Sequence, residues 1–103
     1  SFRAMLSMTE FEREILLAIG SLEEGEVVSY GCIAARAGRA KASRAVGRFL
    51  SKSLVDLPWW RVVRSDGKLH EKSRGRQTEL LRAEGVNVEA GRVQSSPLGK
   101  FSG

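Results

Sequence analysis

Residues 29–51 read SYGCIAARAGRAKASRAVGRFLS, and this stretch decides the fold because it holds two short helical patterns joined by a glycine. Ser29 is placed to cap a helix over residues 30–37. Gly38 follows directly, at the position where a left-handed residue ends many helices. The next helix carries one apolar stripe, made of Ala42, Ala45, Val46, Phe49 and Leu50.

The opposite face of this second helix is polar and basic. It carries Lys41, Arg44, Arg48 and Ser51. Two short helices with a tight turn and an exposed basic second helix indicate a helix-turn-helix. An ordinary pair of packed helices gives the same pattern, so the charge distribution has to support the assignment.

The basic residues are concentrated in one part of the chain. The net charge is +5, from 17 Lys and Arg against 12 Asp and Glu. Residues 36–76 hold twelve basic and three acidic residues, a net charge of +9, while the remainder carries −4. A solvated basic surface is the alternative, but this asymmetry favours a face that binds nucleic acid.

Length and composition exclude several classes of protein. With 103 residues, 42% apolar and 28% charged, the chain is expected to be one globular domain without a membrane span or signal peptide, and therefore cytoplasmic. The one cysteine, Cys32, and the one histidine, His70, exclude an intrachain disulfide and argue against a metal site. We expect no cofactor.

Outward from the central helices, the pattern predicts a first helix over residues 10–20, which Thr9 opens with a capping box. A strand at 61–64, a turn at 65–67 and a returning strand from 68 form a small wing. A last helix covers 75–84. The expected fold is mainly α with a small β wing, a winged-helix-like helix-turn-helix domain over residues 9–86. It lies between a flexible lead (1–8) and a partly disordered tail (87–103).

The sequence PWWRVV at residues 58–63 is unusual because two tryptophans are adjacent. In an extended chain, neighbouring side chains point to opposite sides. One of Trp59 and Trp60 is therefore expected to enter the core while the other lines a cleft, and Pro58 stiffens the entry to this segment. A pair of core aromatics is the simpler alternative.

Four motifs together resemble one family. They are VSYG (28–31), SRAVG (43–47), PWWRVV (58–63) and LLRAEG (80–85). In this order they look like the DNA-binding domain of the O6-alkylguanine-DNA alkyltransferases. This is the C-terminal domain of those proteins, and it has the fold expected here. The transferases carry Pro-Cys-His-Arg-Val, in which the cysteine accepts the alkyl group. Here Trp59 stands at the cysteine position and Trp60 at the histidine position, as in the alkyltransferase-like proteins.

The resemblance implies a function without catalysis. An indole offers no thiolate nucleophile. Alkyltransferase-like proteins bind O6-alkylguanine in duplex DNA, rotate the nucleotide out of the helix and pass the lesion to nucleotide excision repair. The expected partners are therefore double-stranded DNA containing O6-alkylguanine and excision-repair proteins, with the protein acting as a monomer.

The resemblance also assigns roles on the DNA-binding face. Arg44 matches an arginine finger that fills the gap left by the flipped nucleotide, and Tyr30 matches a tyrosine that presses on the 3′ phosphate. Without the resemblance, a phosphate contact or a solvated cation would be the preferred interpretation of Arg44, and a half-buried aromatic at a helix start that of Tyr30. The small residues of the helix permit close approach to the minor groove. The expected contacts are Ser29, Tyr30, Arg39, Lys41, Ala42, Ser43, Arg44, Ala45, Gly47, Arg48 and Ser51.

The lesion pocket implied by the resemblance consists of Tyr30, Pro58, Trp59, Trp60, Arg61, Val62, Lys72 and Ser73. The Val62 main chain is expected to bond the guanine edge, and Ser73 to face O6. Lys72 stands where transferases carry tyrosine, and a cation over the base favours electron-rich guanine by roughly 0.5–2 kcal/mol. Arg61 is expected to pair with a carboxylate, and Glu84 fits the family's buried glutamate, with Trp60 in place of its histidine partner.

Two other functions remain open at this stage. One is a winged-helix transcription regulator that reads a specific sequence, and it would be indifferent to a lesion. The other is a residual alkyltransferase that uses Cys32, and it would accept an alkyl group stoichiometrically. The Trp59-Trp60 pair speaks against both.

Overall fold

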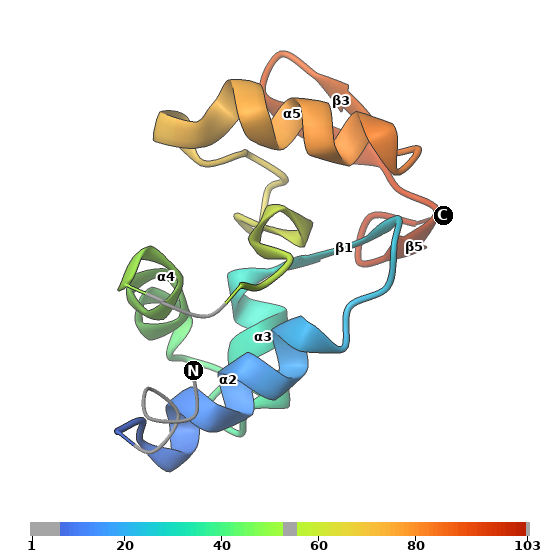
Figure 1. The fold of residues 1–103 in the computed structure, drawn as a ribbon. Coiled ribbons are helices and arrows are strands. Elements are labelled where there is room, and N and C mark those ends of the chain that lie inside the picture. Colours follow the sequence, from blue (N-terminus) through green and yellow to red (C-terminus); the bar gives the residue numbers. More distant parts are fainter. Residues whose placement is uncertain (1–6, 53–55, 103) are drawn as a thin grey trace.

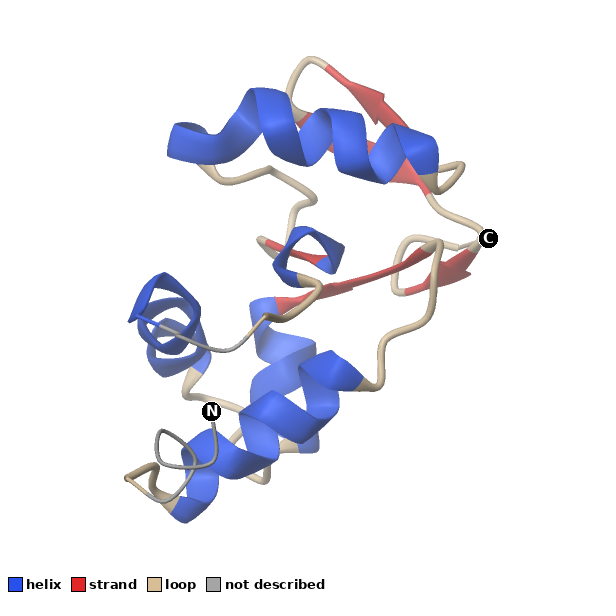
Figure 2. Ribbon diagram, in the orientation of Figure 1, coloured by secondary structure: helices blue, strands red, loops and turns tan. Residues whose placement is uncertain are grey.

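The computed structural model describes residues 7–52 and 56–102 and shows a small sheet between two groups of helices and strands (Figure 1). The helices and 3-10 turns are α2 (Glu10–Gly20), α3 (Tyr30–Arg36), α4 (Ser43–Lys52), η1 (Trp59–Arg61), η2 (Glu71–Ser73) and α5 (Arg74–Ala83). The strands are β1 (Glu26–Ser29), β2 (Val62–Val63), β3 (Asn87–Glu89), β4 (Arg92–Ser95) and β5 (Leu98–Gly99). Helices α2, α3 and α4 lie on one side of β1, while α5 with β3 and β4 lies on the other (Figure 2).

The central sheet joins parts of the chain that are far apart in sequence. Its strand order is β2-β1-β5, and both neighbours run parallel to β1. Val28 pairs with Val62, and Val27 pairs with Gly99. Because side chains alternate along a strand, Val28 and Val62 face the helices, whereas Val27 and Val63 face α5.

The sheet therefore separates two cores. The core on the helical side contains Ile15, Ile19, Leu22, Val28, Ile33, Ala34, Val46, Phe49, Leu57 and Val62. The core beneath α5 contains Val27, Val63, Leu69, Leu81, Val86, Val88 and Val93. The apolar stripe expected on α4 contributes Val46 and Phe49 to the first core, so the basic face of α4 points away from it.

The helix starts follow the sequence closely. The N-terminal helix spans the predicted residues 10–20, and the Thr9 hydroxyl accepts from the Glu12 amide at 3.1 Å while Glu12 accepts from the Thr9 amide at 2.8 Å. The Ser29 hydroxyl caps α3 by accepting from the Cys32 amide at 3.1 Å. Gly38 has a φ of 92°, the left-handed conformation expected after this helix.

The predicted hairpin over residues 61–69 forms only next to its turn, and its predicted first strand is otherwise wrong. The turn at 65–67 forms, since Arg64 donates to the Lys68 carbonyl at 3.1 Å. Residues 59–61 instead form η1, and only Val62 and Val63 are extended, paired in parallel with β1. Both valines are fully buried, as is typical of a parallel strand covered on both faces rather than of an exposed wing.

The predicted disordered tail is also wrong within residues 87–102. This segment forms the antiparallel pair β3-β4 and then β5, which completes the central sheet. Val88 and Val93 are buried against α5, and the Leu69 amide donates to the Gly91 carbonyl at 3.0 Å. The β-hairpin of the domain therefore comes from this segment. Of the expected flexible lead, residues 1–6 lie outside the described residues, and Met8 packs on the first core.

Candidate nucleic-acid interface

A cavity of about 900 Å³ opens between α4 and the segment 64–73, and we refer to it as the α4 cavity. Its walls are formed by Tyr30, Gly31, Ser43, Arg44, Gly47, Leu50, Ser51, Trp59, Arg64, Ser65, His70, Glu71, Lys72 and Ser73. This volume falls within the range of cavities that hold small ligands. The cavity therefore joins the start of the helix-turn-helix to the segment that follows the tryptophan pair.

An aromatic cluster lines one side of the cavity. The Tyr30 hydroxyl lies 2.6 Å from Nδ1 and 2.8 Å from Nε2 of His70. The His70 ring lies at an angle of 52° to the Trp59 ring, with their centroids 6.0 Å apart. Three π-systems from α3, η1 and the loop before η2 thus face a common space, which suits a flat aromatic ligand.

The two tryptophans separate as expected, although by a different backbone route. They lie in η1 rather than in an extended chain, and their rings are nearly perpendicular at 87°. Trp59 lines the α4 cavity, whereas Trp60 packs against the core beneath α5. The 3-10 turn follows Pro58, whose carbonyl accepts from the Arg61 amide at 3.1 Å.

Glu84 ties the tryptophan segment to the end of α5. Its carboxylate accepts from Trp60 Nε1 at 2.8 Å and from Arg61 Nη2 at 2.7 Å. It also accepts from the Gly25 amide at 2.9 Å, and Arg61 reaches on to the Leu22 carbonyl at 2.8 Å. Burial raises the pKa of Glu84, but these hydrogen bonds and the Arg61 charge outweigh it and lower the pKa overall.

Gln77 fixes the other side of the same segment from α5. It is fully buried, and its Nε2 donates to the carbonyls of Trp60 at 3.1 Å and Val62 at 3.3 Å. Its Oε1 accepts from the His70 amide at 2.9 Å. Gln77 therefore holds the backbone of η1 and of the His70 loop in one position, and it was not identified from the sequence.

The α4 edge carries most of the DNA-contacting residues that were expected. Ser43, Arg44, Gly47 and Ser51 line the α4 cavity. Arg44 is exposed at its rim, so its guanidinium is free to reach a ligand. Also exposed on this part of the chain are Lys41 and Arg48, while Ala42 and Ala45 are half-buried.

Some expected residues lie away from this cavity. Pro58, Trp60, Arg61 and Val62 are absent from its walls. The Val62 amide donates to the Trp59 carbonyl and the Val62 carbonyl accepts from Gln77, so both main-chain groups are already paired within the protein. Of the expected pocket set, the cavity therefore brings together Tyr30, Trp59, Lys72 and Ser73.

Two expected DNA contacts have side chains engaged elsewhere. Ser29 is only 2% exposed, and its hydroxyl both caps α3 and donates to Cys32 Sγ at 3.2 Å. This burial rules out its side chain as a surface contact. The Arg39 guanidinium lies over the Phe11 ring, 4.8 Å from its centroid, although it remains exposed.

Several residues of the cavity wall were not expected from the sequence, and His70 matters most among them. Burial of the imidazole lowers the pKa of His70 below its usual 6.5, although a hydrogen bond with the Val62 backbone opposes this shift. The ring is therefore neutral at pH 7 and free of a charge that would repel the nearby cations. That it is the only histidine in the sequence was the one available signal. The other missed residues are Gly31, Leu50, Arg64, Ser65 and Glu71.

Cys32 is not part of the cavity wall. Burial raises the pKa of its thiol, but the Ser29 hydrogen bonds and the charges of Lys100 and Arg36 give a net lowering. In the part of the chain that the structure describes, no group of three His, Cys, Asp or Glu side chains is placed to hold a metal ion. Over the same residues, no helix is long and apolar enough to cross a membrane.

Comparison with known proteins gives a consistent result. Residues 10–86 match the family described as 6-O-methylguanine DNA methyltransferase, DNA-binding domain. A DNA base-flipping protein of Vibrio parahaemolyticus is 38% identical over 91 residues, covering 84% of this chain and 91% of that protein. A methylated-DNA–protein-cysteine methyltransferase of Rattus norvegicus is 40% identical over 95 residues, but the matched region is only 44% of its length.

Solved structures with the same fold include a DNA complex. S. pombe Atl1, bound to damaged DNA containing O6-carboxymethylguanine, has a TM-score of 0.72 and 30% identity, covering 80% of this chain and 82% of that one. The O6-methylguanine methyltransferase of Mycobacterium tuberculosis has a TM-score of 0.68 and 31% identity over 81% of this chain and 53% of that one. The helix-turn-helix domain is thus shared by a DNA-bound alkyltransferase-like protein and a transferase.

Proposed function

From the premise that this chain belongs to the family of the 6-O-methylguanine DNA methyltransferase DNA-binding domain, we propose that it senses O6-alkylguanine in duplex DNA. It binds the lesion by flipping the nucleotide into the α4 cavity, and it does not transfer the alkyl group. Two similarities support this assignment. The chain matches 91% of the length of a DNA base-flipping protein, and its fold is similar to that of DNA-bound Atl1.

The observation that carries the proposal is the position of Trp59. Its side chain lines the α4 cavity at the place where the resemblance puts the acceptor cysteine. No cysteine occurs among the described residues that line this cavity, and the Cys32 thiol is hydrogen-bonded to Ser29 beneath the start of α3. Alkyl transfer requires a thiolate in contact with the alkyl carbon, so a bound lesion stays intact.

Nucleotide flipping requires a group that enters the duplex and a surface that receives the base. Arg44 stands exposed at the cavity rim, where its flat guanidinium stacks on the orphaned partner base. Tyr30 presses on the phosphate of the flipped nucleotide from the opposite wall. The base then meets the rings of Trp59 and His70, and stacking on such rings contributes about 1–3 kcal/mol per base.

Affinity and selectivity come from different parts of this surface. Exposed cations on the α4 side of the 36–76 segment, Lys41 and Arg48 among them, contact phosphates, which gives sequence-independent and salt-dependent binding. Lys72 and Ser73 lie in the wall on the His70 side and distinguish the base. A cation near the base face favours guanine derivatives.

We further propose that the bound protein passes the lesion to nucleotide excision repair, and that it acts as a monomer in the cytoplasm. The absence of a transfer step supports the handover, because a lesion that is bound and left intact needs another repair activity. The resemblance to alkyltransferase-like proteins supports it as well. No cofactor is required for binding by stacking and hydrogen bonding.

Matched titrations separate this function from a sequence-specific regulator. Three duplexes of unrelated sequence, each with guanine or O6-methylguanine at one position, are titrated with the protein at fixed salt. We expect affinity to follow the lesion in all three sequences and to differ little among the undamaged duplexes. A strong preference for one undamaged sequence, with no effect of the lesion, would assign the protein to the regulators instead.

A further inference from the structure

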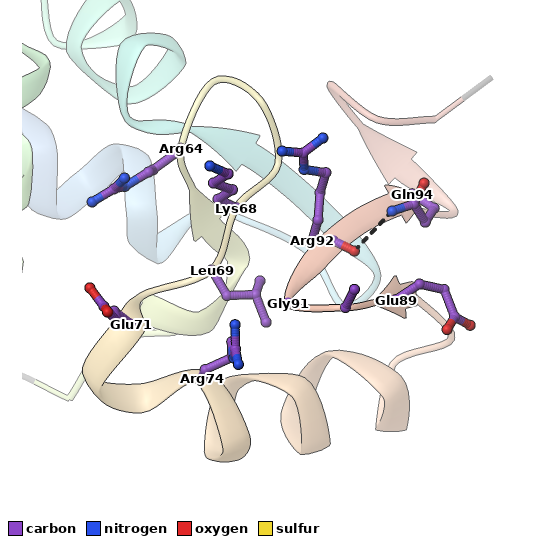
Figure 3. A pocket seen from close by; sticks show the side chains of 10 residues that line it. Arg64, Lys68, Leu69, Glu71, Arg74, Glu89, Gly91, Arg92 and Gln94 are labelled. Atoms are coloured by element: carbon purple, nitrogen blue, oxygen red, sulfur yellow. Dashed lines mark hydrogen bonds between the residues drawn. The ribbon is translucent and has the colours of Figure 1, made fainter.

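A second cavity of about 520 Å³ adjoins the first, and we refer to it as the α5 cavity (Figure 3). It shares Arg64 and Glu71 with the α4 cavity. Its remaining walls come from the loop before η2, the start of α5 and the β3-β4 turn, and consist of Lys68, Leu69, Arg74, Glu89, Ala90, Gly91, Arg92 and Gln94. The two cavities therefore meet at the segment 64–71.

The walls of the α5 cavity carry an excess of cations. The lining includes four basic side chains and two acidic ones, Glu71 and Glu89. Arg92 lies 4.0 Å from Asp66, but both are about half exposed, so this pair is weak. Throughout residues 7–52 and 56–102, no carboxylate lies within 4.0 Å of the cationic groups of Arg64, Lys68 or Arg74. The lining therefore carries a net positive charge, which favours a bound anion.

The Arg74 side chain lies against the β3-β4 turn. A Cβ atom at Gly91 would lie 2.7 Å from Cδ and 2.8 Å from Nη1 of Arg74, so glycine at this position leaves room for the guanidinium beside the turn. The Gly91 carbonyl is fixed in turn by the Leu69 amide at 3.0 Å. Figure 3 shows the Arg74 side chain rising from the start of α5 toward Leu69, with Gly91 to one side. A guanidinium in this place can bind a phosphate in a bidentate manner.

We propose that the α5 cavity binds a backbone phosphate of the DNA strand that enters the α4 cavity. This inference rests on the proposed function, since it extends the DNA contact beyond the flipped nucleotide. The two cavities share two wall residues, so a DNA strand that is bound in one cavity reaches the other without a separate binding event from solution. DNA carries one charge per about 1.7 Å of duplex, so a phosphate is always near.

The test compares two arginines on the same helix. Arg74 lines the α5 cavity, whereas Arg76 lines neither cavity and is exposed. Binding of wild type, Arg74→Gln and Arg76→Gln is titrated across a salt series on one short duplex, with guanine or O6-methylguanine. Lys68→Gln provides an exposed second variant, in case Arg74→Gln fails to fold, and thermal unfolding checks each protein.

We expect Arg74→Gln and Lys68→Gln each to reduce the slope of log affinity against log salt by about 0.9, for both duplexes alike. The ratio of lesion to undamaged affinity stays at the wild-type value, and Arg76→Gln retains the wild-type slope. Wild-type slopes in both cavity variants, with DNA binding intact, would overturn the inference and leave the proposed function standing. Failure of wild type to bind either duplex would overturn the proposed function itself. An acidic peptide that binds wild type more tightly than DNA and loses affinity in Arg74→Gln would assign the cavity to a protein partner.

Discussion

Trp60 Nε1 lies 2.8 Å from Glu84 Oε2, and the same carboxylate binds the Arg61 guanidinium at 2.7 Å. Trp60 stands at the position that the resemblance assigns to the transferase histidine, and it keeps the link to the end of α5. The linking group is now an indole N–H, which neither accepts nor donates a proton in catalysis. The link now serves structure. It anchors η1 and thereby places Trp59 in the α4 cavity.

Glu84→Gln should destabilise the fold by about 3 kcal/mol, because it leaves the Arg61 charge without its partner in a site where the two side chains are only 15% and 8% exposed. Urea unfolding at pH 7 measures the change. Glu79→Gln, on the exposed face of the same helix, serves as the control and should stay within about 0.5 kcal/mol of wild type. Equal effects of the two variants would show that the Glu84 network adds no stability.

The stability of the fold should fall in two separate pH ranges. The pKa of Glu84 is lowered by folding from 4.5, so its contribution is complete above about pH 4.5 and is lost as the pH falls further. The pKa of His70 is lowered from 6.5, so the unfolded chain takes up that proton first and stability declines as the pH falls below about 6.5.

Unfolding free energies between pH 7.5 and about pH 3.5 test both assignments. His70 is the only histidine, so the decline near pH 6 should disappear in His70→Asn while the acid decline remains. In Glu84→Gln the decline near pH 6 should remain while the acid decline becomes smaller, because the Asp66 carboxyl, whose pKa is also lowered in the fold, still contributes. A decline near pH 6 that persists in His70→Asn would mean that another group causes it.

Arg44→Ala should weaken binding to an O6-methylguanine duplex about tenfold, because the finger replaces stacking worth about 1–3 kcal/mol inside the helix. Arg48→Ala, one turn further along the exposed face, removes a screened phosphate contact and should mainly reduce the salt slope by about 0.9. Titrations at matched salt compare the two. Identical losses and identical changes in slope would make Arg44 a phosphate contact only.

Trp59→Cys should not restore alkyl transfer. A thiol with an unperturbed pKa of about 8.5 is only a few per cent ionised at pH 7, and the neighbouring Trp60 indole does not activate it. The loss of the ring that faces His70 should also weaken binding of O6-methylguanine DNA. Trp59→Cys/Trp60→His is the better candidate for activity, since the imidazole would stand beside Glu84.

Stoichiometric methyl transfer to each variant is followed by intact-protein mass spectrometry over minutes. Wild type and Trp60→His, which both lack a thiol at position 59, are the controls. Rapid transfer by the single Trp59→Cys variant would show that the cavity activates a thiol without histidine, and our explanation of the lost chemistry would then be wrong.

The helical half of the domain was predictable because its signals are local. The capping box at Thr9, the Ser29 cap and the turn at Gly38 each depend on residues within one turn of helix. The order of β1, β2 and β5 was not predictable, because parallel pairing joins distant segments of the chain and leaves no local turn signal in the sequence. Residues 87–102 looked like a tail because only a few of their side chains are apolar and enter the core. Val88 and Val93 are among those few.

The site was predictable where the family motifs cover it. Tyr30, Arg44 and Trp59 came from those motifs, Lys72 came from its match to a transferase tyrosine, and the structure places all four around one cavity. Polar residues that act through folded contacts escaped notice. Gln77 lies on α5 and acts on backbone groups 15 and 17 residues away, so no spacing in the sequence points to it.

The proposal of lesion sensing without transfer is tested most directly by recovering the lesion from the bound complex. The protein is incubated with an equimolar mixture of O6-methylguanine duplex and undamaged duplex, in excess over protein, and the complex is isolated. Its DNA is digested and its O6-methylguanine content is measured. We predict that the bound DNA is enriched in O6-methylguanine, that the total amount of the lesion is unchanged and that the protein mass is unaltered. Bound DNA with the composition of the input, or a loss of lesion matched by protein heavier by one methyl group, would contradict the proposal.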